Sequence, residues 1–274
     1  MRHKKTQKLI DVAQKILAEH HPMTVRQVYY QLVSRQGIKN NRGRYQAVSD
    51  ALVAARREGI IPWDWIEDRL RQPRHVSMWD DLADFAEAAI QSYRRDVWAT
   101  QPRRVEAWLE KDALSGIFQD VLNPYGVTLN VGRGYDGWAS IQRAAERFGD
   151  GDSVDVLYFG DFDPSGEDMV RSLIFRLACL GSAPTIVKCA LTADDIRRYN
   201  LPPDPTKSTD NRAAKFIAEH GDNCVELDAL PVDVLRRRLE ETVRDRMDIE
   251  AWEQVRALEQ QDHRQLAGVL GGMR

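Results

Sequence analysis

Apolar side chains recur at helical spacing through the first third of the chain. The pattern predicts helices over residues 5–20, 24–37 and about 45–57, the second of them opening with a capping box and ending at a glycine. A short extended segment over residues 60–63 follows the third helix. Three helices and a short strand are typical of a winged-helix module, so residues 1–75 are predicted to form a DNA-binding domain.

The pattern changes near residue 103. A further helix over residues 79–98 is predicted to fill a linker at 76–100. Beyond it, strand and helix patterns alternate. The predicted strands are 105–109, 127–131, 154–159 and 185–190, and the helices that follow them are 113–121, 138–148, 167–180 and 193–199. This alternation predicts an α/β fold with a mostly parallel sheet covered by helices on both faces. Residues 101–274 would form this second domain, with two final helices as a C-terminal extension.

Charge is unevenly distributed along the chain. The formal net charge is only -3, but residues 1–75 hold 15 Lys and Arg against 7 Asp and Glu, and the remaining residues hold 24 against 35. A basic first third fits a polyanion such as nucleic acid. Arg42 and Arg44 in the basic turn before the predicted third helix, and Arg56 and Arg57 on that helix, are the residues expected to meet phosphates.

Composition excludes several other classes of protein. The 274 residues are 43% hydrophobic and 30% charged, which is ordinary for a globular protein. No apolar run approaches the ~20 residues that cross a bilayer, and the N-terminal residues show no secretory signal, so no membrane partner and a cytoplasmic location are expected. Three cysteines without a Cys-x-x-Cys pair predict neither a disulfide framework nor a thiolate zinc site.

Acidic residues follow two of the predicted strands. Glu110 comes directly after the strand at 105–109, and Asp161 and Asp163 follow the strand at 154–159 between glycines. Because functional groups of a parallel sheet gather beyond the carboxyl ends of its strands, these three side chains are expected to converge. Clustered carboxylates repel one another unless a cation lies among them, and an all-oxygen set favours Mg²⁺ or Mn²⁺. The alternative is that the acids only cap helices and hold no metal.

Three motifs then appear in a specific order: residues 109–113 (LEKDA), 132–136 (GRGYD) and 161–166 (DFDPSG). This series resembles the Toprim domain of the topoisomerase VI A subunit and its meiotic double-strand-break relatives. Residues 190–199 resemble the downstream segment of that family. Residues 26–30 (RQVYY) resemble the family segment whose last tyrosine is the DNA-cleaving nucleophile.

The resemblance implies roles for individual residues. Tyr30 would attack a phosphodiester of double-stranded DNA and remain joined to the 5′ end, with Arg26 one helical turn away on the scissile phosphate. Glu110 and Lys111 would be catalytic, and Glu110 with the two aspartates of residues 161–163 would hold Mg²⁺. Arg133, which stands where the family has lysine, would contact DNA. In that family the tyrosine of one protomer works with the metal site of another, which implies a homodimer.

Departures from the family pattern leave alternatives open. Gln27 replaces an acid, Tyr135 runs directly into Asp136 without the family's proline, and the chain is shorter than typical A subunits. It contains no Gly-x-x-x-x-Gly-Lys phosphate loop, so strand passage would need a separate ATPase subunit. The main expectation is a nucleoid-associated, topoisomerase-like DNA-cleaving enzyme. The alternatives are a Toprim nuclease that uses a metal-activated water and a non-catalytic DNA-binding accessory module.

Overall fold

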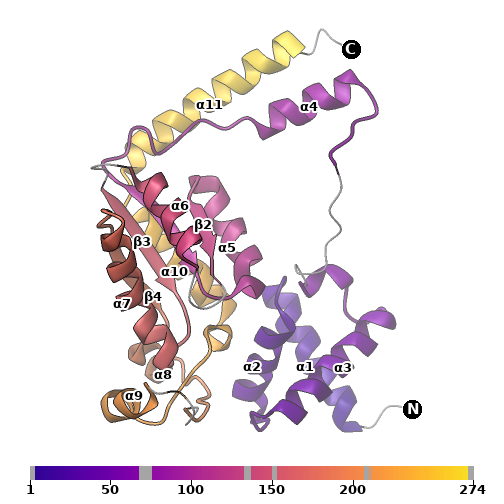
Figure 1. The fold of residues 1–274 in the computed structure, drawn as a ribbon. Helices are drawn as coiled ribbons and strands as arrows, with labels where there is room; N and C mark the ends of the chain where they lie inside the picture. Colours follow the sequence, from indigo (N-terminus) through magenta and orange to yellow (C-terminus); the bar gives the residue numbers. More distant parts are fainter. Residues whose placement is uncertain are drawn as a thin grey trace.

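The computed structural model describes residues 4–67, 76–132, 137–149, 153–206, 210 and 212–270. Helices α1 (Lys4–His20), α2 (Val25–Gln36) and α3 (Arg42–Arg57) pack together beside an α/β part (Figure 1). No helix in these ranges has both the length and the apolar character needed to span a membrane.

The first two helices follow the sequence closely. Thr24 and Gln27 form the predicted capping box of α2, and Gly37 ends this helix in the left-handed region, at φ 61°. Helix α3 begins at Arg42, three residues earlier than predicted, because the Asn41 side chain caps it by accepting a hydrogen bond from the backbone of Arg44.

The predicted strand over residues 60–63 is absent from this described segment. The chain instead forms a 3₁₀ turn, η1 (Trp63–Trp65), and its only recorded strand-like pairing here is a parallel bridge between Met23 and Ile66. Pro62 precedes the turn and has no N–H to donate to a ladder, which is the physical reason that an extended strand does not form there.

The predicted helix over residues 79–98 is shorter than expected. Helix α4 spans Leu82–Ser92 only, and it runs alongside the C-terminal helix α11 (Ile249–Leu270) away from the rest of the protein (Figure 1). Residues beyond α4 pair with α11, where Asp262 accepts hydrogen bonds from Tyr93 and Arg95. These side-chain contacts hold the chain in a non-helical conformation after Ser92.

The α/β part contains a four-stranded sheet whose strands are all parallel. In sequence order they are β1 (Arg104–Leu109), β2 (Thr128–Val131), β3 (Val154–Phe159) and β4 (Thr185–Ala190), and in space their order is β2-β1-β3-β4. The remaining helices are α5 (Ser115–Leu122), α6 (Trp138–Phe148), α7 (Pro164–Cys179), α8 (Ala193–Arg198), α9 (Ala213–His220) and α10 (Val232–Arg244). The predicted α/β class and parallel sheet are therefore confirmed.

Successive strand residues pack on opposite faces of the sheet. Leu157 and Phe159 face a cluster that includes Phe118 of α5 and Leu239 of α10. The other face carries a second cluster. Its buried members are Trp108, Val154, Val156 and Tyr158 from the strands, Ile141, Ala144 and Phe148 from α6, and Met169, Leu173 and Leu177 from α7. The first cluster continues into α1, α2 and α3, so the helical part packs against the sheet and α2 lies near the loops that follow the strands.

Candidate functional site

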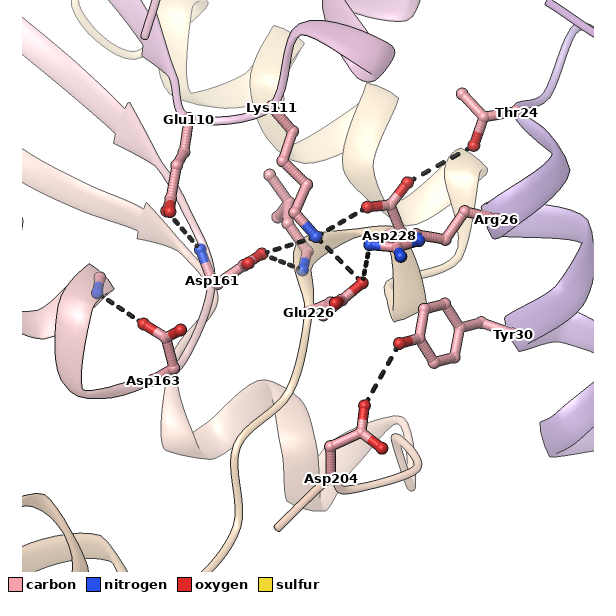
Figure 2. A network of polar contacts seen from close by, with 12 residues as sticks. Thr24, Arg26, Tyr30, Glu110, Lys111, Asp161, Asp163, Asp204, Glu226 and Asp228 are labelled. Carbon is pink, nitrogen blue, oxygen red and sulfur yellow. Dashed lines mark hydrogen bonds and ion pairs between the residues drawn. The ribbon is translucent and has the colours of Figure 1, made fainter. Parts of the chain in front are cut away.

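The carboxyl edge of the sheet meets α2 through a network of charged side chains (Figure 2). Glu110 and Lys111 leave the end of β1, and Asp161 leaves the end of β3. Glu226 and Asp228 come from the segment around the 3₁₀ turn η5 (Leu227–Ala229). This segment lies beside the β3 loop because Phe162 and Val225 form an antiparallel bridge.

Lys111 is the centre of this network. Its Nζ lies 3.1 Å from Asp161 Oδ1, 3.1 Å from Glu226 Oε2 and 2.9 Å from Asp228 Oδ2. Burial disfavours the charged ammonium, but the three carboxylates outweigh it and raise the pKa of Lys111 above its usual value. Lys111 is therefore a fixed positive charge at the edge of the sheet.

Helix α2 contributes Arg26 and Tyr30 to the same network. One Arg26 guanidinium nitrogen lies 2.6 Å from Glu226 Oε2, the oxygen that Lys111 also contacts. The Tyr30 side chain is buried, and its hydroxyl donates to Asp204 Oδ2 at 3.4 Å. Burial, followed by the charges of Glu226 and Asp204, raises the pKa of Tyr30 well above the ordinary phenol value, so Tyr30 stays protonated.

The three acids predicted to bind metal lie at one edge but are held apart by other contacts. Glu110 Oε2 accepts from the Asp161 backbone N–H at 3.0 Å and from the Tyr158 hydroxyl at 3.2 Å. Asp161 Oδ1 accepts from Leu227 N–H at 2.7 Å. Asp163 Oδ1 accepts from Gly166 N–H at 2.7 Å and caps α7. Within the described ranges no three acidic, histidine or cysteine side chains form a metal-binding group.

The two glycines that flank the Asp161–Asp163 segment are needed for this geometry. A Cβ on Gly160 would lie 2.6 Å from Glu110 Oε2, and a Cβ on Gly166 would lie 2.2 Å from the Asp161 carbonyl oxygen. Neither glycine needs an unusual backbone angle, so its role is to allow close approach. Glu110 and Asp161 can adjoin only because position 160 has no side chain.

The donor chemistry fits Mg²⁺, although the three carboxylates do not surround one point. Burial raises the pKa of Asp161 to about 7, the charge of Glu110 adds to this, and Lys111 opposes it. The pKa is raised mainly because the carboxylate is buried, and an oxygen-binding dication between Glu110 and Asp161 would favour its charged form. Asp163 would have to release Gly166 N–H to join them.

Two important carboxylates of this site were not identified from the sequence. Residues 224–227 have an extended, strand-like sequence pattern, and Asp228 directly follows them, so the rule that acids after strands are functional candidates applied to Asp228 too; Glu226 lies within this segment and gave no such signal. Asp204 gave no such signal, because it lies in a proline-rich loop. It reaches Tyr30 only through its backbone pairing with Cys224, at N–O distances of 2.7 and 2.9 Å.

The predicted DNA-contacting arginines are divided between two surfaces. Arg56 lines a cavity of about 470 Å³ together with Arg26 and Lys111, and its guanidinium lies over the Trp63 ring at 4.9 Å. Arg44 lines a separate cavity of about 410 Å³, where the other charged lining residues are Lys5, Lys8 and Lys39. Arg42 and Arg57 are exposed on α3. Arg133 lies outside the described residues.

No protein-family model matches this chain, and no curated protein sequence matches it. The argument for function therefore depends on the geometry of the site. The arrangement offers a buried phenol, two cations and several carboxylates at one edge of the sheet, and among these carboxylates Asp161 has a raised pKa.

Proposed function

We propose that this chain is a Mg²⁺-dependent DNA-cleaving protein in which Tyr30 attacks a phosphodiester, with a winged-helix part and a Toprim domain like those of topoisomerase VI A subunits. One observation carries the proposal: Arg26 of α2 and Lys111, which follows the end of β1, meet on the same oxygen of Glu226, and Lys111 also contacts Asp161. Residues far apart in sequence thus form one continuous site next to Tyr30.

The charges of this site suit phosphoryl transfer. Arg26 and Lys111 are positive groups that can stabilise the charge that develops on a phosphate under attack. The carboxylates that contact Arg26 and Lys111 orient these two side chains. A phosphate that entered the site would compete with the carboxylates for both cations. Glu110, Asp161 and Asp163 would hold Mg²⁺, which supplies further neutralisation of phosphate charge when it is bound.

The same proposal implies which molecules this protein binds. The basic cavity that contains Arg44, Lys5, Lys8 and Lys39 suits the backbone of double-stranded DNA outside the cleavage point. We also propose a homodimer, as in the related family, and a separate ATPase subunit if the protein passes strands. Light scattering and plasmid relaxation with and without added ATPase would test these two points.

Covalent trapping tests the main proposal. The protein is incubated with supercoiled plasmid and Mg²⁺, denatured with detergent and digested with protease. We expect peptide bound to 5′ ends, and we expect it to disappear in Tyr30→Phe. Tyr93→Phe is the matched control, because Tyr93 also donates its hydroxyl to an aspartate, Asp262 at 2.8 Å, but lies on the segment after α4. An adduct that persists in Tyr30→Phe contradicts the tyrosine mechanism.

A hydrolytic nuclease is the second candidate, and the burial of Tyr30 favours it. A phenol that is 4% exposed, with its proton retained, is a poor nucleophile until a base removes that proton. In this case free nicked DNA would form in Tyr30→Phe and would be lost in Glu110→Gln. DNA binding without any Mg²⁺-dependent cleavage would instead indicate a non-catalytic accessory module.

A further inference from the structure

Tyr29, Asn40, Asp204 and Tyr30 form a continuous chain of hydrogen bonds. The Tyr29 hydroxyl donates to Asn40 Oδ1 at 2.9 Å, and Asn40 Nδ2 donates to Asp204 Oδ1 at 2.7 Å. The Tyr30 hydroxyl donates to the other oxygen, Asp204 Oδ2, at 3.4 Å. Asp204 is thus held on one side by the Asn40 amide. On its other side it faces the Tyr30 phenol (Figure 2).

The Tyr30 hydroxyl must lose its proton before or during attack. The charged groups that face it are Glu226, Asp204 and Arg26. Only the two carboxylates can accept a proton, so one of them is the candidate base. The choice between them depends on what else each carboxylate contacts.

Glu226 is the weaker candidate. Its Oε2 is shared by Arg26 at 2.6 Å and Lys111 at 3.1 Å. Although burial opposes the change, these two cations lower the pKa of Glu226, which makes it a poorer proton acceptor. Asp204 has no recorded contact with a cationic side chain in the described ranges. Its side-chain partners are the neutral Asn40 amide and Tyr30 itself.

We propose that Asp204 is the general base that accepts the Tyr30 proton, with Asn40 and Tyr29 as positioning residues. This inference rests on the proposed tyrosine mechanism. In the step, the proton of the phenol moves to Asp204 Oδ2 and the phenolic oxygen forms a bond to phosphorus. The bond from phosphorus to the 3′ oxygen breaks, and that oxygen takes a proton from water. The 3.4 Å separation is long for a catalytic hydrogen bond, and such contacts tighten when substrate is bound.

The order nucleophile, base and orienting group is the arrangement by which proteins activate hydroxyl nucleophiles. Here the base comes from the loop between α8 and α9, and its orienting amide comes from the turn between α2 and α3. The arrangement also gives Tyr29 a function distinct from that of its neighbour. Tyr29 orients Asn40, and Tyr30 supplies the reacting oxygen.

The test is the rate of covalent adduct formation in single turnover, measured from pH 5 to pH 9. Asp204→Asn retains the shape of the side chain and an oxygen that accepts from Tyr30, but removes the basicity. We expect the rate to fall about 10²- to 10³-fold, which is the usual size of a general-base effect. Imidazole or formate should restore part of the rate, and DNA affinity should not change. Asp194→Asn, on the exposed side of α8, is the matched control.

Two further measurements separate a catalytic role from a structural one. Asn40→Ala should reduce the rate less than Asp204→Asn, about 10-fold, with no rescue by added base. In protein labelled with ¹³Cζ-tyrosine, the Tyr30 resonance, assigned with Tyr30→Phe, should shift in Asp204→Asn and not in Asp194→Asn. This second readout needs neither Mg²⁺ nor DNA.

Each contrary result has a distinct meaning. If wild-type protein forms no adduct, both the tyrosine mechanism and the role of Asp204 are wrong. If the adduct forms at the wild-type rate in Asp204→Asn, only the role of Asp204 is wrong. A reduced rate with weaker DNA binding and no rescue by small bases would show that Asp204 is merely structural, which also overturns the inference.

Discussion

Acidic side chains serve different purposes at the two ends of the parallel strands. Toward the amino ends, each buried acid has arginine partners of its own. Glu106 receives both arms of the Arg147 guanidinium at 2.9 Å, and Asp155 lies 3.1 Å from Arg103 and 3.2 Å from Arg246. These acids are almost fully buried, at 6% and 2% exposed, and their charges are neutralised locally.

At the carboxyl edge, acids outnumber the cations that contact them. Lys111 is shared among Asp161, Glu226 and Asp228, and Glu110 accepts hydrogen bonds from a backbone amide and a tyrosine. Burial above all, with a smaller contribution from the charge of Glu110 and against the opposing charge of Lys111, raises the pKa of Asp161 to about 7. Acids that only support a fold are paired separately, whereas this edge retains negative charge that favours a further cation.

The largest effect should come from Glu110→Gln. Removing this carboxylate should reduce the rate of DNA cleavage about 10³-fold, as the loss of a charge-stabilising group does. The free energy of unfolding should be unchanged or slightly higher, because Asp161 loses a repelling neighbour. Cleavage kinetics and urea unfolding measure the two quantities. Glu241→Gln, at an exposed position of α10, is the matched control. A large loss of stability would place Glu110 with the structural acids.

The pH dependence of stability at Asp161 should be opposite in sign to that of an acid whose pKa is lowered in the folded protein. The folded-state pKa of Asp161, about 7, lies above its unfolded value of 3.8, so the native state binds more protons between these values. Stability relative to Asp161→Asn should therefore fall as the pH rises from about 4 to 7, by at most about 4 kcal/mol at 1.4 kcal/mol per pKa unit.

Urea unfolding at pH 4, 5.5 and 7 for wild type and Asp161→Asn gives this difference directly. Well below the unfolded-state pKa of 3.8 the difference should become constant, because Asp161 is then protonated in both states. A difference that instead grows in favour of wild type as the pH rises would mean that Lys111 outweighs burial at this carboxylate.

The fold was predictable from the sequence where periodicity alone decides it. The bounds of β3, β4 and α6 agree with the sequence pattern. The two strands belong to the sheet and α6 packs directly against it, so their apolar positions follow the period of each element. The segment around Pro62 and the helix that ends at Ser92 were not predictable in detail. Their conformation depends on one long-range bridge at Met23 and on contacts with α11, which no local pattern encodes.

The site was predictable only in part. The rule that acids follow strands predicts that Glu110 and Asp161 share one edge of the sheet, but it does not place Arg26 beside them. The link between them, Glu226, depends on the pairing of the chain at Val225 with Phe162, which is a tertiary contact. Asp204 was missed for the same reason. The sequence shows which residues carry charge, but long-range pairing determines which charges meet.

Breaking an acid–arginine ion pair at the amino ends of the strands should have a smaller effect. It should lower stability and leave DNA cleavage unchanged. Arg147→Met leaves Glu106 buried without its bidentate partner and should lower the free energy of unfolding by about 2 kcal/mol. The loss should be smaller than for a fully buried pair, because the Arg147 side chain is 40% exposed. DNA cleavage by the folded variant should not change. Arg143→Met, one turn earlier on α6, is the control. If Arg147→Met lowers cleavage at wild-type stability, the proposed division between the two ends is wrong.

The smallest effect should be stabilisation by Mg²⁺ itself, and it should depend on the carboxyl edge alone. A ligand that binds only the native state raises the free energy of unfolding by RT ln(1 + [L]/Kd), which is about 1.4 kcal/mol at ten times Kd. Thermal unfolding with increasing Mg²⁺ should show this rise in wild type and in Arg147→Met. The rise should disappear in Glu110→Gln and in Asp161→Asn. If Mg²⁺ stabilises these two variants as much as it stabilises wild type, the ion binds elsewhere, and the excess of acids at this edge has another cause.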